Sequence, residues 1–217
     1  MKELPIFKAE ELASWYLRLN GFLTIPNFVL HPNRPGPQRT DADIIGIRFP
    51  FRKEFPGKGV DDSLLKLSAS KPSLYFAEVK SRQMDLNEAW QNRDKENINR
   101  ALLAIGLLKS EKSVREAADA LYSKGIYDGK SYYCSLLFIG NVDEGRIPSR
   151  YDLVPRILWS HIINFVHCRF REFLRIKSDG QQWDDVGKEL YRLAECHSAL
   201  GDYEAKVRRV FGLPVAA

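Results

Sequence analysis

An acidic and a basic residue stand two positions apart in an otherwise apolar segment of the chain. Residues 74–80 read LYFAEVK and are followed at once by the polar stretch SRQ. The composition predicts a buried strand over 73–80, in which residues two apart project from the same face. Glu78 and Lys80 therefore project together where the strand reaches solvent. Charges at the rim of a buried strand are costly unless they are paired or metal-bound.

A second apolar segment carries another carboxylate. Residues 42–48 predict a strand buried on both faces, and Asp43 lies at its start. If the two strands are neighbours, Asp43 and Glu78 converge on one spot. Asp41 points to the same side of this strand as Asp43, so it stays an alternative.

Two carboxylates beside a lysine suit phosphodiester hydrolysis. The transition state of this reaction gathers negative charge, which a hard cation such as Mg²⁺ and a fixed ammonium group both stabilise. Mg²⁺ prefers oxygen ligands, chiefly carboxylates, and it acidifies a bound water into a nucleophile. We expect Lys80 to be charged, because neighbouring carboxylates favour its protonated form, and to orient the water. A role as general base stays open once a metal neutralises the carboxylates.

The motif acidic-x-Lys is not rare, so its predicted structural context decides whether it is significant. It also occurs at Asp128-Gly129-Lys130, in a predicted turn, and at Glu204-Ala205-Lys206, in a predicted helix. Residues two apart on a helix do not face each other. Only Glu78 and Lys80 lie on a strand that follows another strand bearing an aspartate. An ordinary ion pair at a strand end is the alternative interpretation.

Hydrophobic periodicity predicts the elements that position these residues. An α/β (α+β) fold with a central mixed sheet flanked by helices is expected, with a core at 1–145 and a helical extension at 146–217 packed on it. Extended segments are predicted at 22–30 (interrupted at Pro26), 42–48, 73–80 and 132–139. Helices are predicted at 8–20, 97–108, 113–124 (opened by a Ser113/Glu116 capping box), 155–174, 183–200 and 203–211, with a possible short helix at 61–67.

Composition limits the class of protein. The 217 residues carry a net charge of +5, which permits an anionic partner. No apolar run approaches the ~18 residues that cross a bilayer, and the start lacks a secretory signal, so we expect a cytoplasmic protein with no membrane partner. The three cysteines and four histidines show no ligand spacing, which predicts neither zinc nor a disulfide framework. The cysteines are expected to be buried apolar side chains.

Three segments resemble one known superfamily. Residues 10–22, EELASWYLRLNGF, resemble a first helix of pattern E-x-L-A-x-x-Y-L-x-x-x-G-[FY]. Residues 43–45 resemble a D-I-I strand, and residues 76–82, FAEVKSR, resemble a V-E-V-K-[ST]-[KR] strand. The chain thus resembles the PD-(D/E)XK nucleases, in the branch of Holliday junction resolvase-like endonucleases. The likeness covers about the first 82 residues and is weaker through the strand at residue 132.

The resemblance implies a restriction-endonuclease-like core and a set of site residues. It assigns metal ligation to Asp43 and Glu78, with support from Glu10, and makes Lys80 the catalytic lysine. The metal would be Mg²⁺, with Mn²⁺ as a substitute. The chain departs from short resolvases in two ways: Asp43 and Glu78 are separated by 35 residues instead of a tight hairpin, and a helical tail follows the core. For Glu10 the alternative is a helix-dipole role, because acidic residues favour a first helical turn.

The expected function is a magnesium-dependent endonuclease acting on DNA, with RNA left open as a substrate and a homodimer possible. Nucleic-acid contacts are predicted for Arg34 and Arg39, in the proline-rich loop before Asp43, and for Arg82 and Gln83, just after Lys80. A solvated charged face would explain Arg82 and Gln83 equally well. Arg34 and Arg39 are the better candidates, because their loop must border the site. The alternative functions are a catalytically inactive nuclease-fold module that binds nucleic acid, and an interaction scaffold.

Overall fold

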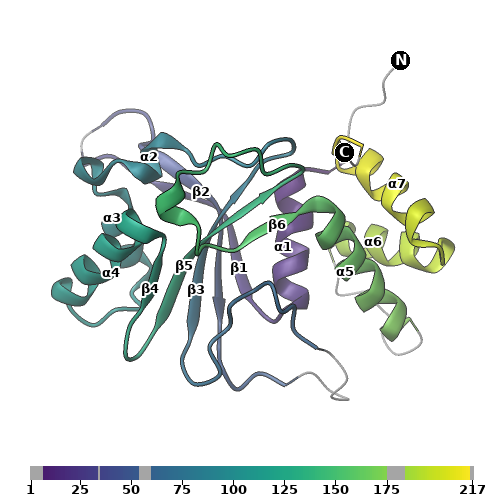
Figure 1. Cartoon of the computed structure of the whole chain (residues 1–217), viewed down its shortest axis with the longest axis horizontal. Coiled ribbons are helices and arrows are strands. Elements are labelled where there is room, and N and C mark those ends of the chain that lie inside the picture. Colours follow the sequence, from purple (N-terminus) through teal and green to yellow (C-terminus); the bar gives the residue numbers. More distant parts are fainter. Residues whose placement is uncertain (1–6, 34, 54–59, 175–183, 216–217) are drawn as a thin grey trace.

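The protein is an α/β structure built on a six-stranded mixed sheet with helices on both faces (Figure 1). The computed structural model describes residues 7–33, 35–53, 60–174 and 184–215. The strands follow the order β1-β2-β3-β5-β4. The sixth strand, β6, pairs with the last residues of β5, whereas β4 pairs with its first residues. The predicted fold class is confirmed at this level.

The sheet combines an antiparallel half with a parallel half. Strands β1, β2 and β3 form an antiparallel meander, β3 and β5 are parallel, and β5 is antiparallel to β4 and parallel to β6. Every residue of β3 and β5 is buried, as expected for strands covered on both faces. The strand bounds are β1 Leu23–Leu30, β2 Thr40–Arg48, β3 Ser73–Val79, β4 Ile126–Asp128, β5 Tyr133–Gly140 and β6 Arg156–Leu158.

Two hydrophobic cores flank the sheet. One face packs against α1 (Ala9–Leu19), α5 (Trp159–Phe173), α6 (Asp185–Cys196) and α7 (Leu200–Val210). The other packs against α2 (Glu88–Gln91), α3 (Asn97–Ile105) and α4 (Glu111–Lys124). Short 3₁₀ turns lie at Arg93–Lys95 and Ser149–Tyr151. The described part of 146–217 supplies both β6 and the C-terminal helices, and the division at residue 145 stays a prediction.

Most predicted elements form within a few residues of their expected bounds, and β1 continues through its proline. Pro26 pairs with Ile44, and the β1–β2 register is the same on both sides of it. β1 is an edge strand, where a proline is tolerated because its missing N–H can face away from the sheet. The predicted interruption at Pro26 is therefore wrong.

The short helix predicted at 61–67 does not form. These residues are turns and irregular backbone, held by Asp62. The Asp62 carboxylate accepts bonds from the Tyr16 hydroxyl at 2.8 Å and the Leu64 N–H at 3.0 Å, and pairs with His161 Nε2 at 2.5 Å. The Asn20 side chain accepts from the Asp62 N–H at 2.7 Å. These bonds replace the helical pattern, because short polar side chains compete with it for backbone groups.

Two predicted helix starts are also corrected. The helix expected from residue 155 begins at Trp159, because residues 156–158 extend as β6 and Pro155 O accepts the Phe138 N–H at 3.0 Å. The cap of α4 is Ser110 rather than Ser113, and its side chain accepts the Ser113 N–H at 3.2 Å.

The cysteines are only partly as predicted. Cys134 is buried, but Cys168 and Cys196 are exposed, so the expectation is wrong for these two. Among the described residues, no helix has the length and apolar character required to cross a membrane.

The Asp62 network predicts a large stability effect for one substitution. Asp62→Ala leaves the buried Tyr16 hydroxyl and the Leu64 N–H without their acceptor, and we expect a loss of about 2–4 kcal/mol in the free energy of unfolding. Urea denaturation measures it, with exposed Asp94→Ala as the control. A loss below about 1 kcal/mol would contradict this account of the 60–67 segment.

Candidate active site

The β2–β3 register brings Asp43 and Glu78 together. Ile44 pairs with Ala77 across the two antiparallel strands, so Asp43 and Glu78 come next on each side. Although 35 residues separate them in the chain, they occupy facing positions where the β2–β3 pairing ends. Glu78 is near the end of β3, whereas Asp43 lies inside β2, which begins at Thr40, so that Asp43 is not at the start of the strand as predicted. The end of this pairing also holds the start of the 80–87 segment.

One ammonium group joins the two carboxylates. Lys80 Nζ donates to Glu78 Oε1 at 2.5 Å and lies 3.7 Å from Asp43 Oδ2. Asp43 Oδ2 also accepts the Val79 N–H at 2.7 Å, which fixes the carboxylate against the end of β3. The Lys80 backbone is held too, because its N–H donates to Ile139 O and its carbonyl accepts from Trp159 Nε1, both at 2.9 Å.

Glu78 is the buried member of the group, with only 5% of its surface exposed. Its pKa is raised to about 7: burial and the nearby Asp43 charge raise it, while Lys80 and the Asn87 N–H lower it. The cover on this side comes from α2. Trp90 packs on Phe76 with ring centroids 6.1 Å apart. Its indole N–H donates to the Asp41 carbonyl at 3.0 Å.

The other two groups are also shifted. Burial raises the pKa of Asp43; the Val79 N–H and Lys80 lower it, Glu10 raises it, and the net shift is upward. Burial alone would lower the pKa of Lys80, but the charges of its acidic neighbours outweigh it, and the pKa lies above that of an ordinary lysine. Lys80 is therefore an ammonium ion at neutral pH, as the sequence predicts.

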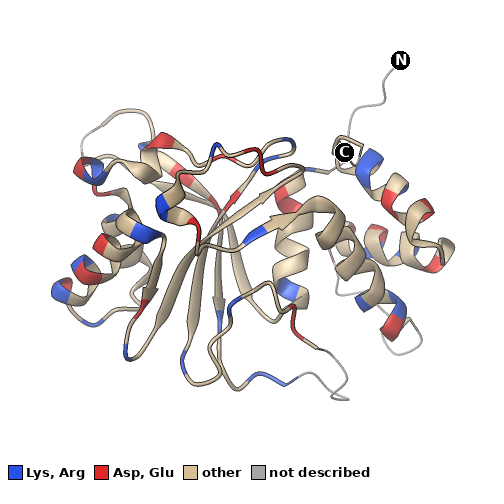
Figure 2. Cartoon of the chain, in the orientation of Figure 1, with Lys and Arg blue, Asp and Glu red and all other residues tan. Residues whose placement is uncertain are grey.

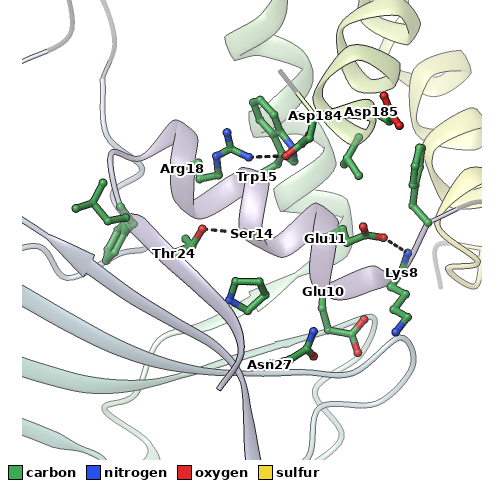
Figure 3. Close-up of a pocket in the computed structure, with 15 residues that line it drawn as sticks. Lys8, Glu10, Glu11, Ser14, Trp15, Arg18, Thr24, Asn27, Asp184 and Asp185 are labelled. Atoms are coloured by element: carbon green, nitrogen blue, oxygen red, sulfur yellow. Dashed lines mark hydrogen bonds and ion pairs between the residues drawn. The ribbon is translucent and has the colours of Figure 1, made fainter. Parts of the chain in front are cut away.

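Glu10 lies at the edge of this group. It is half-buried in the first turn of α1, and its charge acts on Asp43. It also lines an open cavity of about 750 Å³ between α1, the edge strand β1 and the start of α6 (Figure 3). Within the described chain no hydrogen bond or ion pair engages the Glu10 carboxylate, whereas Glu11 accepts the Lys8 N–H at 2.7 Å.

Asp41 and Asp43 have different roles. Asp43 contacts both Lys80 and the Val79 N–H, whereas Asp41 offers its backbone carbonyl to Trp90. The charge of Asp41 adds to the upward shift of the Asp43 pKa. This geometry favours Asp43 over Asp41 as the carboxylate of the site.

The predicted nucleic-acid contacts lie in different settings. Arg39 is tied down, with Nε donating to Asn97 Oδ1 at 3.1 Å and Nη2 to Lys95 O at 2.6 Å. Arg82 is exposed two residues after Lys80, and half-buried Gln83 forms a β-bridge with Val142. Arg34 lies outside the described residues. Arg82 is therefore the described member best placed to meet a ligand beside Lys80.

Sequence reasoning missed Asp85, whose negative charge also raises the pKa of Lys80. Asp85 is half-buried and lies five residues after Lys80, so it belongs to the same 80–87 segment. A carboxylate so soon after a strand-end lysine is the signal that could have found it. The Asn87 N–H, which stabilises ionised Glu78, left no signal because any residue supplies a backbone donor.

The carboxylates fit a hard cation by their chemistry. Asp43 and Glu78 offer oxygen ligands of the kind that Mg²⁺ takes, and it completes its shell with water. Two carboxylates share one ammonium here, and both have raised pKa values, so the group would gain from more positive charge. Within the described ranges, no three His, Cys, Asp or Glu residues are grouped closely enough to hold a metal on their own.

Charged residues elsewhere lie on helices, loops and strand ends, and the middle of the sheet is uncharged (Figure 2).

Searches against protein-family models, curated proteins and solved structures found no match to this chain. We therefore infer the function from the geometry of the site.

The raised pKa of Glu78 predicts how stability depends on pH. In metal-free protein an acid with a raised pKa favours folding at low pH, and this contribution is lost as pH rises from about 4.5 through about 7. We expect Glu78→Gln to flatten the dependence and to gain up to about 3 kcal/mol relative to wild type at pH 8. Urea unfolding across pH 4–9 measures both.

Exposed Glu116→Gln is the matched control and should keep the wild-type profile. Parallel curves for wild type and Glu78→Gln would show that Glu78 titrates normally in the folded protein.

Proposed function

We propose that the protein is a metal-dependent phosphodiester hydrolase acting on DNA, with a restriction-endonuclease-like core. The observation that carries the proposal is the Lys80 ammonium held between Asp43 and Glu78, where the pairing of two adjacent strands ends. An ordinary surface ion pair does not need a second carboxylate, and it gains little from burying one. Burial of Glu78 with a pKa near 7 marks the group as a functional-site candidate.

The chain's own residues divide the work of such a reaction. Asp43 and Glu78 would hold the divalent cation, with Glu10 nearby. When bound, the cation would supply an acidified water and a positive charge beside the scissile phosphate. Lys80 stays protonated, donates to the transition-state oxygens and orients the water. The Val79 N–H fixes Asp43, and the Trp159 indole fixes the Lys80 backbone, so both charges are already oriented.

Contact with a polyanion fits the exposed Arg82 beside this group and the net charge of +5. A module that binds nucleic acid without cutting it is the alternative. The two functions share a basic surface and differ in chemistry, so one assay separates them.

The test is incubation with supercoiled plasmid, branched DNA and RNA in Mg²⁺, Mn²⁺ or EDTA. We expect metal-dependent cleavage of DNA that falls about 10²–10³-fold in Lys80→Met, because one fixed positive donor is lost from the transition state. DNA affinity should change little, because Lys80 is one charge among many phosphate contacts.

Lys130→Met is the matched control. Lys130 ends another acidic-x-Lys triplet but is exposed, in a turn away from the two carboxylates, so cleavage should equal wild type. Metal-independent binding without cleavage would select the binding module. Neither binding nor cleavage would leave the fold as a scaffold.

A further inference from the structure

Asn27 interrupts the β1–β2 ladder directly opposite Asp43. The register pairs Pro26 with Ile44 and Phe28 with Ala42, and the position between them, where Asn27 would face Asp43, is unpaired. The ladder resumes in the same register beyond it. The disturbance is therefore a single residue wide and lies beside a carboxylate of the candidate site.

Asn27 has a backbone conformation that residues other than glycine rarely adopt. Asn27 has φ 49°, and among the described non-glycine residues only Glu96 shares a positive value. After glycine, asparagine is among the residues best suited to this region, often because its side chain bonds to nearby backbone. Here no such bond forms: within the described ranges the Asn27 amide makes no hydrogen bond, and the residue is exposed. Local bonding therefore does not explain the conformation.

The conformation places Asn27 in the cavity beside Glu10. Both residues line this open space, and Figure 3 shows their side chains at the same end of it. Glu10 is the residue whose charge acts on Asp43 from this side. Asn27 from β1 and Glu10 from α1 thus meet at one end of the cavity, and both side chains have no partner in the described chain. Asp43 does not line the cavity, but it occupies the position opposite Asn27 on the neighbouring strand β2.

Protection of the sheet edge is the competing explanation. A proline and a kink on an edge strand discourage pairing with another chain. Pro26 already serves this purpose, and Leu23 and Ile25 remain 66% and 46% exposed on the same strand. Edge protection also gives no reason why the kink should face Asp43 or turn an amide toward Glu10.

We infer that Asn27 is a positioning residue of the candidate site, whose amide oxygen holds water of the hydrated divalent cation on the Glu10 side. An amide oxygen is a hard, neutral acceptor, and Mg²⁺ and Mn²⁺ retain several waters in sites with few carboxylates. Groups that orient metal-bound ligands typically alter metal affinity 10–100-fold. The inference depends on the proposed function, because it requires a cation at Asp43 and Glu78.

Calorimetric titration with Mn²⁺ tests it on Asn27→Gly and Asn27→Asp. Glycine adopts the positive φ more easily and removes the amide, so Asn27→Gly should keep or raise the melting temperature while weakening Mn²⁺ binding about 10-fold. Asn27→Asp tolerates the backbone and keeps an oxygen, so it should bind Mn²⁺ at least as tightly as wild type. Gel filtration of all three proteins tests edge protection.

The outcomes separate this inference from the proposed function. Equal Mn²⁺ affinity in wild type and Asn27→Gly would overturn the role of Asn27 and leave the nuclease proposal standing. Self-association of Asn27→Gly with unchanged affinity would assign the kink to edge protection. Absence of Mn²⁺ binding by wild type, together with absence of cleavage, would overturn both.

Discussion

The site depends on one ammonium ion that two carboxylates share at the end of a buried sheet. Lys80 contacts Glu78 directly and Asp43 at longer range, and it opposes the rise in the Glu78 pKa that burial causes. Removing an ionisable group from water is costly without a partner. One lysine only partly balances two carboxylates whose pKa values are both raised. The unbalanced charge is the physical reason to expect a cation.

The fold keeps these groups close by rigid means. β3 is covered on both faces, so its end is fixed by two cores, and the parallel pairing with β5 continues through the Lys80 N–H. Trp159 and Trp90 reach the site from opposite faces, one bonding the Lys80 carbonyl and the other the Asp41 carbonyl. Groups built on packed strands keep their positions better than groups on loops. The edge strand β1 lines the open cavity beside Glu10, so the less regular part of the sheet lies at this cavity.

The sequence predicts what local pattern determines. The apolar runs around Asp43 and Glu78 identify both strands. The spacing of two residues between Glu78 and Lys80 predicts that their side chains project from the same face. Long-range contacts lie beyond this reasoning. The helix predicted around Asp62 does not form, because Asp62 bonds to Tyr16 and His161 from helices far away in the sequence. Residues 156–158 become a strand because β5 offers them an open edge. Asn27 lies in the segment predicted to be extended, and only the register shows that it is opposite Asp43.

The most direct measurement is a crystal structure of the wild-type protein soaked in Mn²⁺, with the ion located by its anomalous scattering. Our account predicts an ion bound by oxygens of Asp43 and Glu78, with Lys80 beside it and Glu10 on the cavity side. An ordered site elsewhere, or Lys80 still bridging the two carboxylates at saturating Mn²⁺ with no ion between them, would contradict it.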